Sequence, residues 1–254
     1  MKIHRILILA AGGLLLWQLV VAATGAPAYI LPGPLPVARA IVSHWPELWH
    51  HLQTTLAEIV SGLVIGTLLG TICAVVMILS PLLKRWLLPV LVVSQAIPVF
   101  ALAPVLVLWL GYGMASKVAM AVLIIFFPVA SSFYHGMRRT DGELLELGRI
   151  MGASKTSLFY YIIIPSALPA FGSGLRVATA VAPIGAVVGE WVGSSSGLGF
   201  YMLHANARMQ IDRMFAALTV LALVSLLLYF IIDTLVAKTL YWENPKDLTH
   251  EKIL

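Results

Sequence analysis

One short stretch of the chain carries residues that could do phosphate chemistry. Residues 148–156 read GRIMGASKT, which is close to the phosphate-binding pattern G-x-x-x-x-G-K-[ST]. In that loop backbone amides cradle the phosphates, and a glycine stands directly before the lysine. Here Ser154 stands before Lys155, and no buried strand precedes the stretch. We therefore exclude nucleotide binding by this chain and expect no cofactor in it.

Histidines and the one cysteine are the other residues that could bind a metal or catalyse a reaction. His44, His50 and His51 have only Glu47 near them at ligand spacing, so we interpret them as an interfacial polar face. Cys73 lies inside an apolar run and has no intrachain disulfide partner. A membrane enzyme would need a convergent set of such side chains. We therefore predict no metal site and no catalytic residues.

The composition identifies a membrane protein. Of the 254 residues, 60% are hydrophobic and only 11% are charged, whereas a soluble domain has about a quarter charged residues. The net charge of +5 comes from residues between apolar runs. We interpret these charges as topology signals and expect no nucleic-acid partner.

Six segments are long enough to cross a bilayer, which takes roughly 20 apolar residues. They are predicted at Ile6–Ala23, Leu56–Leu79, Leu87–Leu110, Val118–Phe133, Phe171–Val192 and Phe215–Ala237. Six spans put both termini on one side. If that side is cytoplasmic, 12 of the 16 Lys and Arg residues lie inside, and only Arg39, Lys117, Arg208 and Arg213 lie outside. The positive-inside rule expects this bias.

These spans divide the chain into three parts. Residues 1–55 hold the first helix and an amphipathic extracytoplasmic segment, residues 56–240 form the core, and residues 241–254 form a cytoplasmic tail. A cytoplasmic loop covers about residues 138–168. Glycines recur every four residues at Gly62, Gly66 and Gly70, and again at Gly185, Gly189 and Gly193. Such spacing predicts close helix packing, either within the chain or between subunits.

The third and fifth spans contain prolines, which remove an amide donor and clash with the preceding turn. The third span must therefore be bent or interrupted. Because broken backbone in a membrane is tolerated only against protein or a wet cavity, both spans are candidates to line a translocation path. A kinked structural helix is the alternative. The candidate path residues are Ser94, Gln95, Pro98, Pro183, Glu190 and Trp191. Glu190 is included because charges inside a membrane are costly and usually functional. Glu58 and Asp233 are also acidic residues at or near span ends, and we rank them below Glu190 as path residues.

The cytoplasmic loop is predicted to begin with a helix. Leu144, Leu147 and Met151 share one side of it, and Gly152 ends it in a sharp turn.

A second short helix should follow the turn. Ser154 is its expected N-cap, and it runs from Lys155 to about Ile163. Pro165 is expected to stop it, because the residue before a proline disfavours the helical region. Two short helices projecting from a membrane domain would form a rigid contact surface for a cytoplasmic partner.

The loop resembles the EAA motif of ABC importer permeases. The residues at the motif's spacing are Glu146, Gly152, Ile162 and Pro165. The chain departs from the motif at Leu147 and Gly148, which replace paired alanines, and at Ile164. Nearly the whole chain resembles the nitrate/sulfonate/taurine-type branch of these permeases, through LPGPLPVARAI, IPVFALAPVLVLWLGYGMASKV and GEWVGSSSGLGFYM.

This resemblance implies an all-α polytopic subunit with the type I ABC importer permease fold in a bacterial inner membrane. It implies four kinds of partner: two cytoplasmic ATPase copies that bind ATP and Mg, an extracytoplasmic solute-binding protein, a second permease copy and membrane lipid. Glu146 would pair with a basic ATPase residue. The ATPase-coupling residues carried over are Glu146, Gly152, Ala153, Ser154, Leu158, Phe159 and Pro165.

The alternative is a secondary transporter complete in one chain. It would need inverted repeats with midplane ion ligands, and no repeat relates the two halves of this sequence. The solute stays open among sulfonates, taurine, nitrate and thiamine pyrimidine precursors. Residues 189–210 favour the last class. Selectivity in this family is largely a property of the binding protein.

Overall fold

The computed structural model describes residues 3–242, with side chains from Ile8 onward. This part of the chain contains helices and turns without a strand, which confirms the predicted all-α class. The elements are α1 (Ile3–Thr24), α2 (Pro34–Ser43), α3 (Trp45–Leu79), α4 (Pro81–Ala96), α5 (Val99–Leu110), α6 (Met114–Arg138), α7 (Gly142–Ile150), α8 (Lys155–Leu158), the π-helical turn η1 (Phe159–Ile163), α9 (Ile164–Gly193), α10 (Leu198–Ala207) and α11 (Ile211–Thr239). Lys2, Lys246, Lys252 and most of the predicted tail at 241–254 lie outside the described residues.

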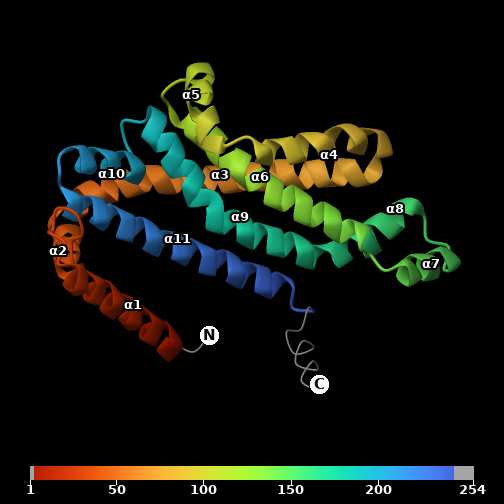
Figure 1. Cartoon of the computed structure of the whole chain (residues 1–254). Helices are drawn as coiled ribbons and strands as arrows, with labels where there is room; N and C mark the ends of the chain where they lie inside the picture. Colours follow the sequence, from red (N-terminus) through yellow and green to blue (C-terminus); the bar gives the residue numbers. More distant parts are fainter. Residues whose placement is uncertain (1–2, 243–254) are drawn as a thin grey trace.

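The long helices run lengthwise through the molecule. Figure 1 shows α7 and α8 at one end and α2 and α10 at the other. Within the described residues four helices are long and apolar enough to cross a membrane, namely α3, α6, the continuous helix Lys155–Gly193 and α11, and the α4–α5 pair would make a fifth span. The predicted first span falls on α1. Its described side chains cover Ile8–Thr24, a shorter apolar helix, so a sixth crossing stays a prediction.

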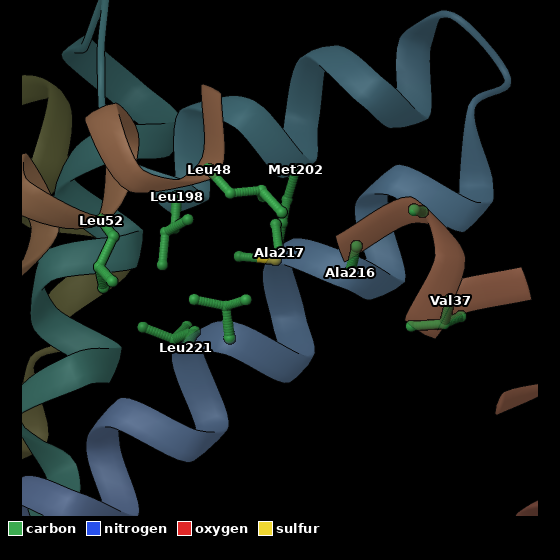
Figure 2. Packing of buried hydrophobic residues seen from close by; sticks show 10 residues of the cluster. Val37, Leu48, Leu52, Leu198, Met202, Ala216, Ala217 and Leu221 are labelled. Carbon is green, nitrogen blue, oxygen red and sulfur yellow. The ribbon is translucent and has the colours of Figure 1, made fainter. Parts of the chain in front are cut away.

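Helix α3 begins earlier than the predicted span at Leu56. It starts at Trp45 and runs unbroken through residue 55, so the proposed boundary between residues 55 and 56 lies inside a helix. At the usual helical rise its 35 residues extend about 52 Å, well beyond a hydrocarbon core of about 30 Å. The added turns are held by Leu48 and Leu52, which are buried among residues of α2, α10 and α11 (Figure 2).

Helix α6 lies between two glycine-lined faces. A Cβ atom on Gly62 of α3 would lie 2.5 Å from the Cβ of Ala121, and one on Gly185 of α9 would lie 2.7 Å from the Cα of Ala121. Both neighbours therefore approach α6 more closely than any side chain would allow. The predicted packing seams thus lie within the chain. The last glycine of the second set, Gly193, instead meets Val107 of α5.

The predicted interruption of the third span is confirmed as a break between α4 and α5. Helix α4 ends at Ala96, α5 begins at Val99, and the two helices are bent by 104°. Pro98 stands between them and supplies no amide hydrogen to continue α4. Pro89 and Pro104 lie inside helices. The predicted single span is therefore two helices, and one of its three prolines makes the break.

The seam gives a direct stability test. We expect Gly185→Ala to lower the melting temperature of the purified chain, because overpacking a close contact costs about 1–3 kcal/mol. The matched control is Gly12→Ala on α1, where an added Cβ would meet no atom within 4 Å. Equal melting temperatures for the two variants in the same detergent would contradict the packing described here.

Candidate functional site

The first candidate site is the projection formed by α7, the turn at Gly152 and α8, which we call the α7–α8 projection (residues 141–158). Asp141 begins α7 by accepting a hydrogen bond from the amide of Glu143 at 2.9 Å. Gly152 has φ +81, in the left-handed region that favours glycine. The amide of Gly152 donates to the carbonyl of Arg149, and that of Ala153 donates to the carbonyl of Gly148. These two hydrogen bonds form the Schellman motif, so the turn is fixed by its own backbone.

The start of the second helix is confirmed, but its end is not. Ser154 caps it by accepting from the amide of Ser157 at 3.1 Å. Pro165 does not stop it, because α8 passes through η1 directly into α9. A proline removes one amide donor and crowds the carbonyl four residues earlier, and the wider π turn just before Pro165 accommodates both effects. Lys155–Gly193 is therefore one continuous helix of 39 residues.

The apolar face of α7 is exposed. Leu144, Leu147, Ile150 and Met151 are all exposed, Ile150 by 84% of its surface. Glu146 on the same helix is also exposed. The predicted shared side for Leu144, Leu147 and Met151 thus exists, and all three side chains are exposed.

Two residues expected in the contact surface are buried instead. Leu158 is 7% exposed and packs over Gly148, where a Cβ would lie 2.6 Å from its Cδ2 atom. Phe159 is 8% exposed and belongs to a buried cluster with Phe133 and Tyr134. Leu158 therefore holds α8 against α7, and Phe159 holds the projection against the bundle. The exposed surface includes α7, Gly152 and Ser154.

The predicted path residues fall in two separate places. Pro183 and Trp191 line an apolar groove of about 810 Å³ between α9, α10 and α11, together with Met202, Leu203 and Leu218.

The other path candidates lie at the α4–α5 break and do not line this groove. Ser94 donates to the carbonyl of Leu91 at 2.7 Å, while Gln95 and Pro98 are exposed. Within this single chain the two sets do not meet.

Glu190 does not line the groove but lies in a buried polar network. It is 1% exposed, and its carboxylate accepts hydrogen bonds from the Thr55 hydroxyl at 2.6 Å, the Gly199 amide, and the Phe200 amide at 3.4 Å. The Thr55 hydroxyl accepts from the Leu198 amide at 2.8 Å. One threonine of α3 thus connects the end of α9 to the first turn of α10. A carboxylate is favoured there because a helix N-terminus presents unpaired amides and a positive dipole end.

The glycines of GEWVGSSSGLG make room for this network. A Cβ on Gly197, which has φ +111, would lie 2.2 Å from the Glu190 Cδ atom, and one on Gly199 would lie 2.7 Å from Glu190 Oε2. The amide of Gly197 also donates to His51 Nδ1 at 3.1 Å. The motif therefore encodes a turn that wraps closely around one carboxylate.

An ion pair extends the buried charges to α6. The Nζ atom of Lys117 lies 3.0 Å from Oε1 of Glu58, and both side chains are almost fully buried. Lys117 is therefore a buried partner of Glu58 and not one of the exposed outer charges counted from the sequence. Near the middle of the continuous helix, Arg176 of α9 pairs with Asp233 of α11 at 2.7 Å.

Sequence reasoning missed Thr55 and Lys117 as members of this network. Nothing in a single sequence marks them, because Thr55 lies 135 residues from its partner Glu190. The closely spaced glycines around residue 197 were the one sequence feature that indicated a tight turn near Glu190. No group of metal-ligating side chains occurs among the described residues.

The membrane-length helices identify a polytopic membrane protein, and the α7–α8 projection gives it an exposed apolar surface at one end. Residues 66–240 match the family described as binding-protein-dependent transport system inner membrane component, and the chain belongs to that family.

Its relatives agree. The chain is 52% identical over 228 residues to a probable ABC transporter permease protein of Haemophilus influenzae, covering 90% of this chain and 93% of that one. It is 38% identical to the formylaminopyrimidine transport permease protein ThiX of Halalkalibacterium halodurans, covering 92% and 93%. It is 30% identical to the putative aliphatic sulfonates transport permease protein SsuC of Bacillus subtilis, covering 94% and 87%. This protein is the permease subunit of an ABC importer.

The fold is also that of a solved importer. A chain of the MetNI methionine ABC transporter superposes with a TM-score of 0.60 at 20% identity, covering 80% of this chain and 97% of that one. At this identity the likeness concerns the fold alone, and it confirms the predicted importer-permease architecture.

The network predicts a sharp difference between two conservative variants. Thr55→Val keeps the side-chain shape but leaves Glu190 and the Leu198 amide without their shared hydroxyl, which should lower stability by about 1–3 kcal/mol. Thr55→Ser keeps the hydroxyl and should stay close to wild type. Thermal unfolding of both purified variants tests this. A Val variant as stable as the Ser variant would contradict the described bonding.

Proposed function

We propose that the α7–α8 projection binds a separate cytoplasmic ATPase subunit, and that two such subunits drive a pair of permease copies. The observation that carries this proposal is the exposed apolar face of Leu144, Leu147, Ile150 and Met151 beside the exposed Glu146. Exposed apolar patches of this kind mark interaction sites, because contact between apolar side chains and water is unfavourable and a partner protein removes it. A basic residue of the ATPase would pair with Glu146 at the edge of the patch.

The projection is built to transmit force. Its turn is fixed by the two backbone hydrogen bonds around Gly152, Leu158 packs α8 against α7, and Phe159 packs against the bundle. Because α8, η1 and α9 are continuous, a displacement of the projection acts along a helix that ends beside Glu190. ATP-driven closure of the two ATPases would thereby switch the bundle between packed arrangements.

The orientation of the chain in the membrane is inferred from the distribution of its Lys and Arg residues. From the sequence pattern, 12 of the 16 Lys and Arg residues are assigned to the cytoplasmic side and four, Arg39, Lys117, Arg208 and Arg213, to the outer side. This bias supports cytoplasmic termini in a bacterial inner membrane. ATP and Mg would be bound by the ATPase and not by this chain.

The solute would be a small organic molecule delivered by an extracytoplasmic binding protein. The relatives named for riboflavin and formylaminopyrimidine are 40% and 38% identical, and the one named for aliphatic sulfonates is 30% identical. We therefore place a pyrimidine-type heterocycle ahead of sulfonates, taurine and nitrate. Ligand binding by the protein encoded beside this permease gene tests the ranking, and a preference for a sulfonate would reverse it.

Reversing the charge of the coupling surface should disconnect transport from ATP. In Glu146→Lys we expect normal membrane insertion but at least tenfold less ATPase subunit co-purified with the chain. Glu143→Lys makes the same charge change on the same exposed helix, away from the motif position, and serves as the matched control. Normal co-purification and uptake by Glu146→Lys would count against the coupling role.

The path residues can be tested by thiol labelling in a Cys73→Ser background, which removes the only cysteine. We expect cysteines at Gln95, Pro183 and Trp191 to react with a water-soluble thiol reagent in membranes. Leu226, an exposed residue in the middle of α11, should face lipid and stay protected. Uniform protection at all four positions would exclude a wet path along these helices.

A further inference from the structure

Helix α10 forms one wall of the apolar groove, and its first turn is held by the Glu190 network. Met202, Leu203 and Asn206 of α10 line the groove opposite Pro183 and Trp191 of α9. Glu190 and Trp191 are neighbours in the sequence, but the Glu190 side chain accepts the hydrogen bond from Thr55, whereas the Trp191 side chain lines the groove. The position of α10 therefore decides the width of the groove.

The attachment of α10 differs in kind from the seam around α6. In the seam, backbones touch through glycines, and separating them would open a void along whole helices. The first turn of α10 combines apolar packing of Leu198 with directed hydrogen bonds to two side chains, Glu190 and Thr55. A four-residue connection, Ser194–Gly197, joins it to α9 and contains a glycine at φ +111. The hydrogen bonds at the first turn of α10 can therefore break while the glycine contacts of the seam stay intact.

The hydrogen bonds of Glu190 lie near the far end of the helix that a displaced α7–α8 projection would move. Glu190 is close to the end of the continuous helix that begins at Lys155, while Thr55 belongs to α3. A hydrogen bond of 2.6 Å between these side chains loses most of its strength once the oxygens are more than about 3.5 Å apart. A shift of α9 against α3 by about 1 Å would therefore break it.

We propose that the Glu190–Thr55 contact to the first turn of α10 is the lock of a gate at the end of the molecule opposite the α7–α8 projection. Glu190 acts as a positioning residue: while the contact is closed α10 stays against α3, and its release in each transport cycle lets α10 move and changes the opening of the groove. This inference rests on the proposed coupling of the projection to an ATPase. A purely structural network would stay closed throughout the cycle.

Hydrogen exchange on the assembled complex separates these two possibilities. The wild-type permease and its ATPase are compared in lipid nanodiscs, once without nucleotide and once trapped with ATP and vanadate. We expect the amides of Leu198, Gly199 and Phe200 to exchange at least tenfold faster in one of the two states. A reference peptide from the seam, residues 120–126, should exchange equally in both.

Equal protection of the α10 amides in a complex that hydrolyses ATP would overturn the lock and leave the proposed function standing. Failure of the chain to bind any ATPase subunit would overturn both.

A cross-link between α3 and α10 tests independently whether α10 has to move during the transport cycle. Tyr201 of α10 donates to Glu47 of α3 at 3.4 Å, outside the lock, and burial raises the pKa of its phenol, which keeps it protonated. In Cys73→Ser we place cysteines at Glu47 and Tyr201 and join them with a bifunctional methanethiosulfonate. ATP turnover by the complex should fall at least tenfold and return on reduction, with the unlinked double variant as control. Turnover within twofold of that control after complete cross-linking would overturn the requirement for α10 motion.

Discussion

The structure depends on the close contact of α6 with glycine-lined faces of α3 and α9. Without side chains at Gly62 and Gly185, both helices reach the backbone around Ala121. Lipid tails give apolar helices no hydrophobic reason to associate, so such van der Waals contact has to supply the association. The three helices therefore behave as one body. The other elements are attached to it, with α7 and α8 at one end and α10 at the other.

This arrangement gives the molecule two ends with different chemistry. The α7–α8 end presents exposed apolar side chains on a backbone-fixed turn, which suits a partner protein. The α10 end buries two carboxylates: Glu190 accepts a hydrogen bond from Thr55, and Glu58 pairs with Lys117. One continuous helix from Lys155 to Gly193 connects the ends. In the proposed function this helix transmits motion from the end that binds the ATPase to the end that receives the solute.

The features predicted correctly from the sequence are local ones. The turn at Gly152, the cap at Ser154 and the break near Pro98 each follow from a few adjacent residues. The features that were wrong or missed need the tertiary structure. Pro165 does not end its helix because a π turn precedes it, and Leu158 is buried because α7 packs over it. The partners of Glu190 and Glu58 come from other helices, so periodicity and motif spacing could not identify them.

The most direct test of the account is photo-cross-linking from the exposed face of α7. A photoreactive amino acid at Ile150, which is 84% exposed, should capture the ATPase subunit in intact membranes. The same amino acid at Tyr112, which is 77% exposed at the opposite end of α6, should not. Capture from Ile150 alone is the predicted result. Capture from Tyr112, or from neither position in a complex that hydrolyses ATP, would contradict the claim that α7 and α8 receive the energy for transport.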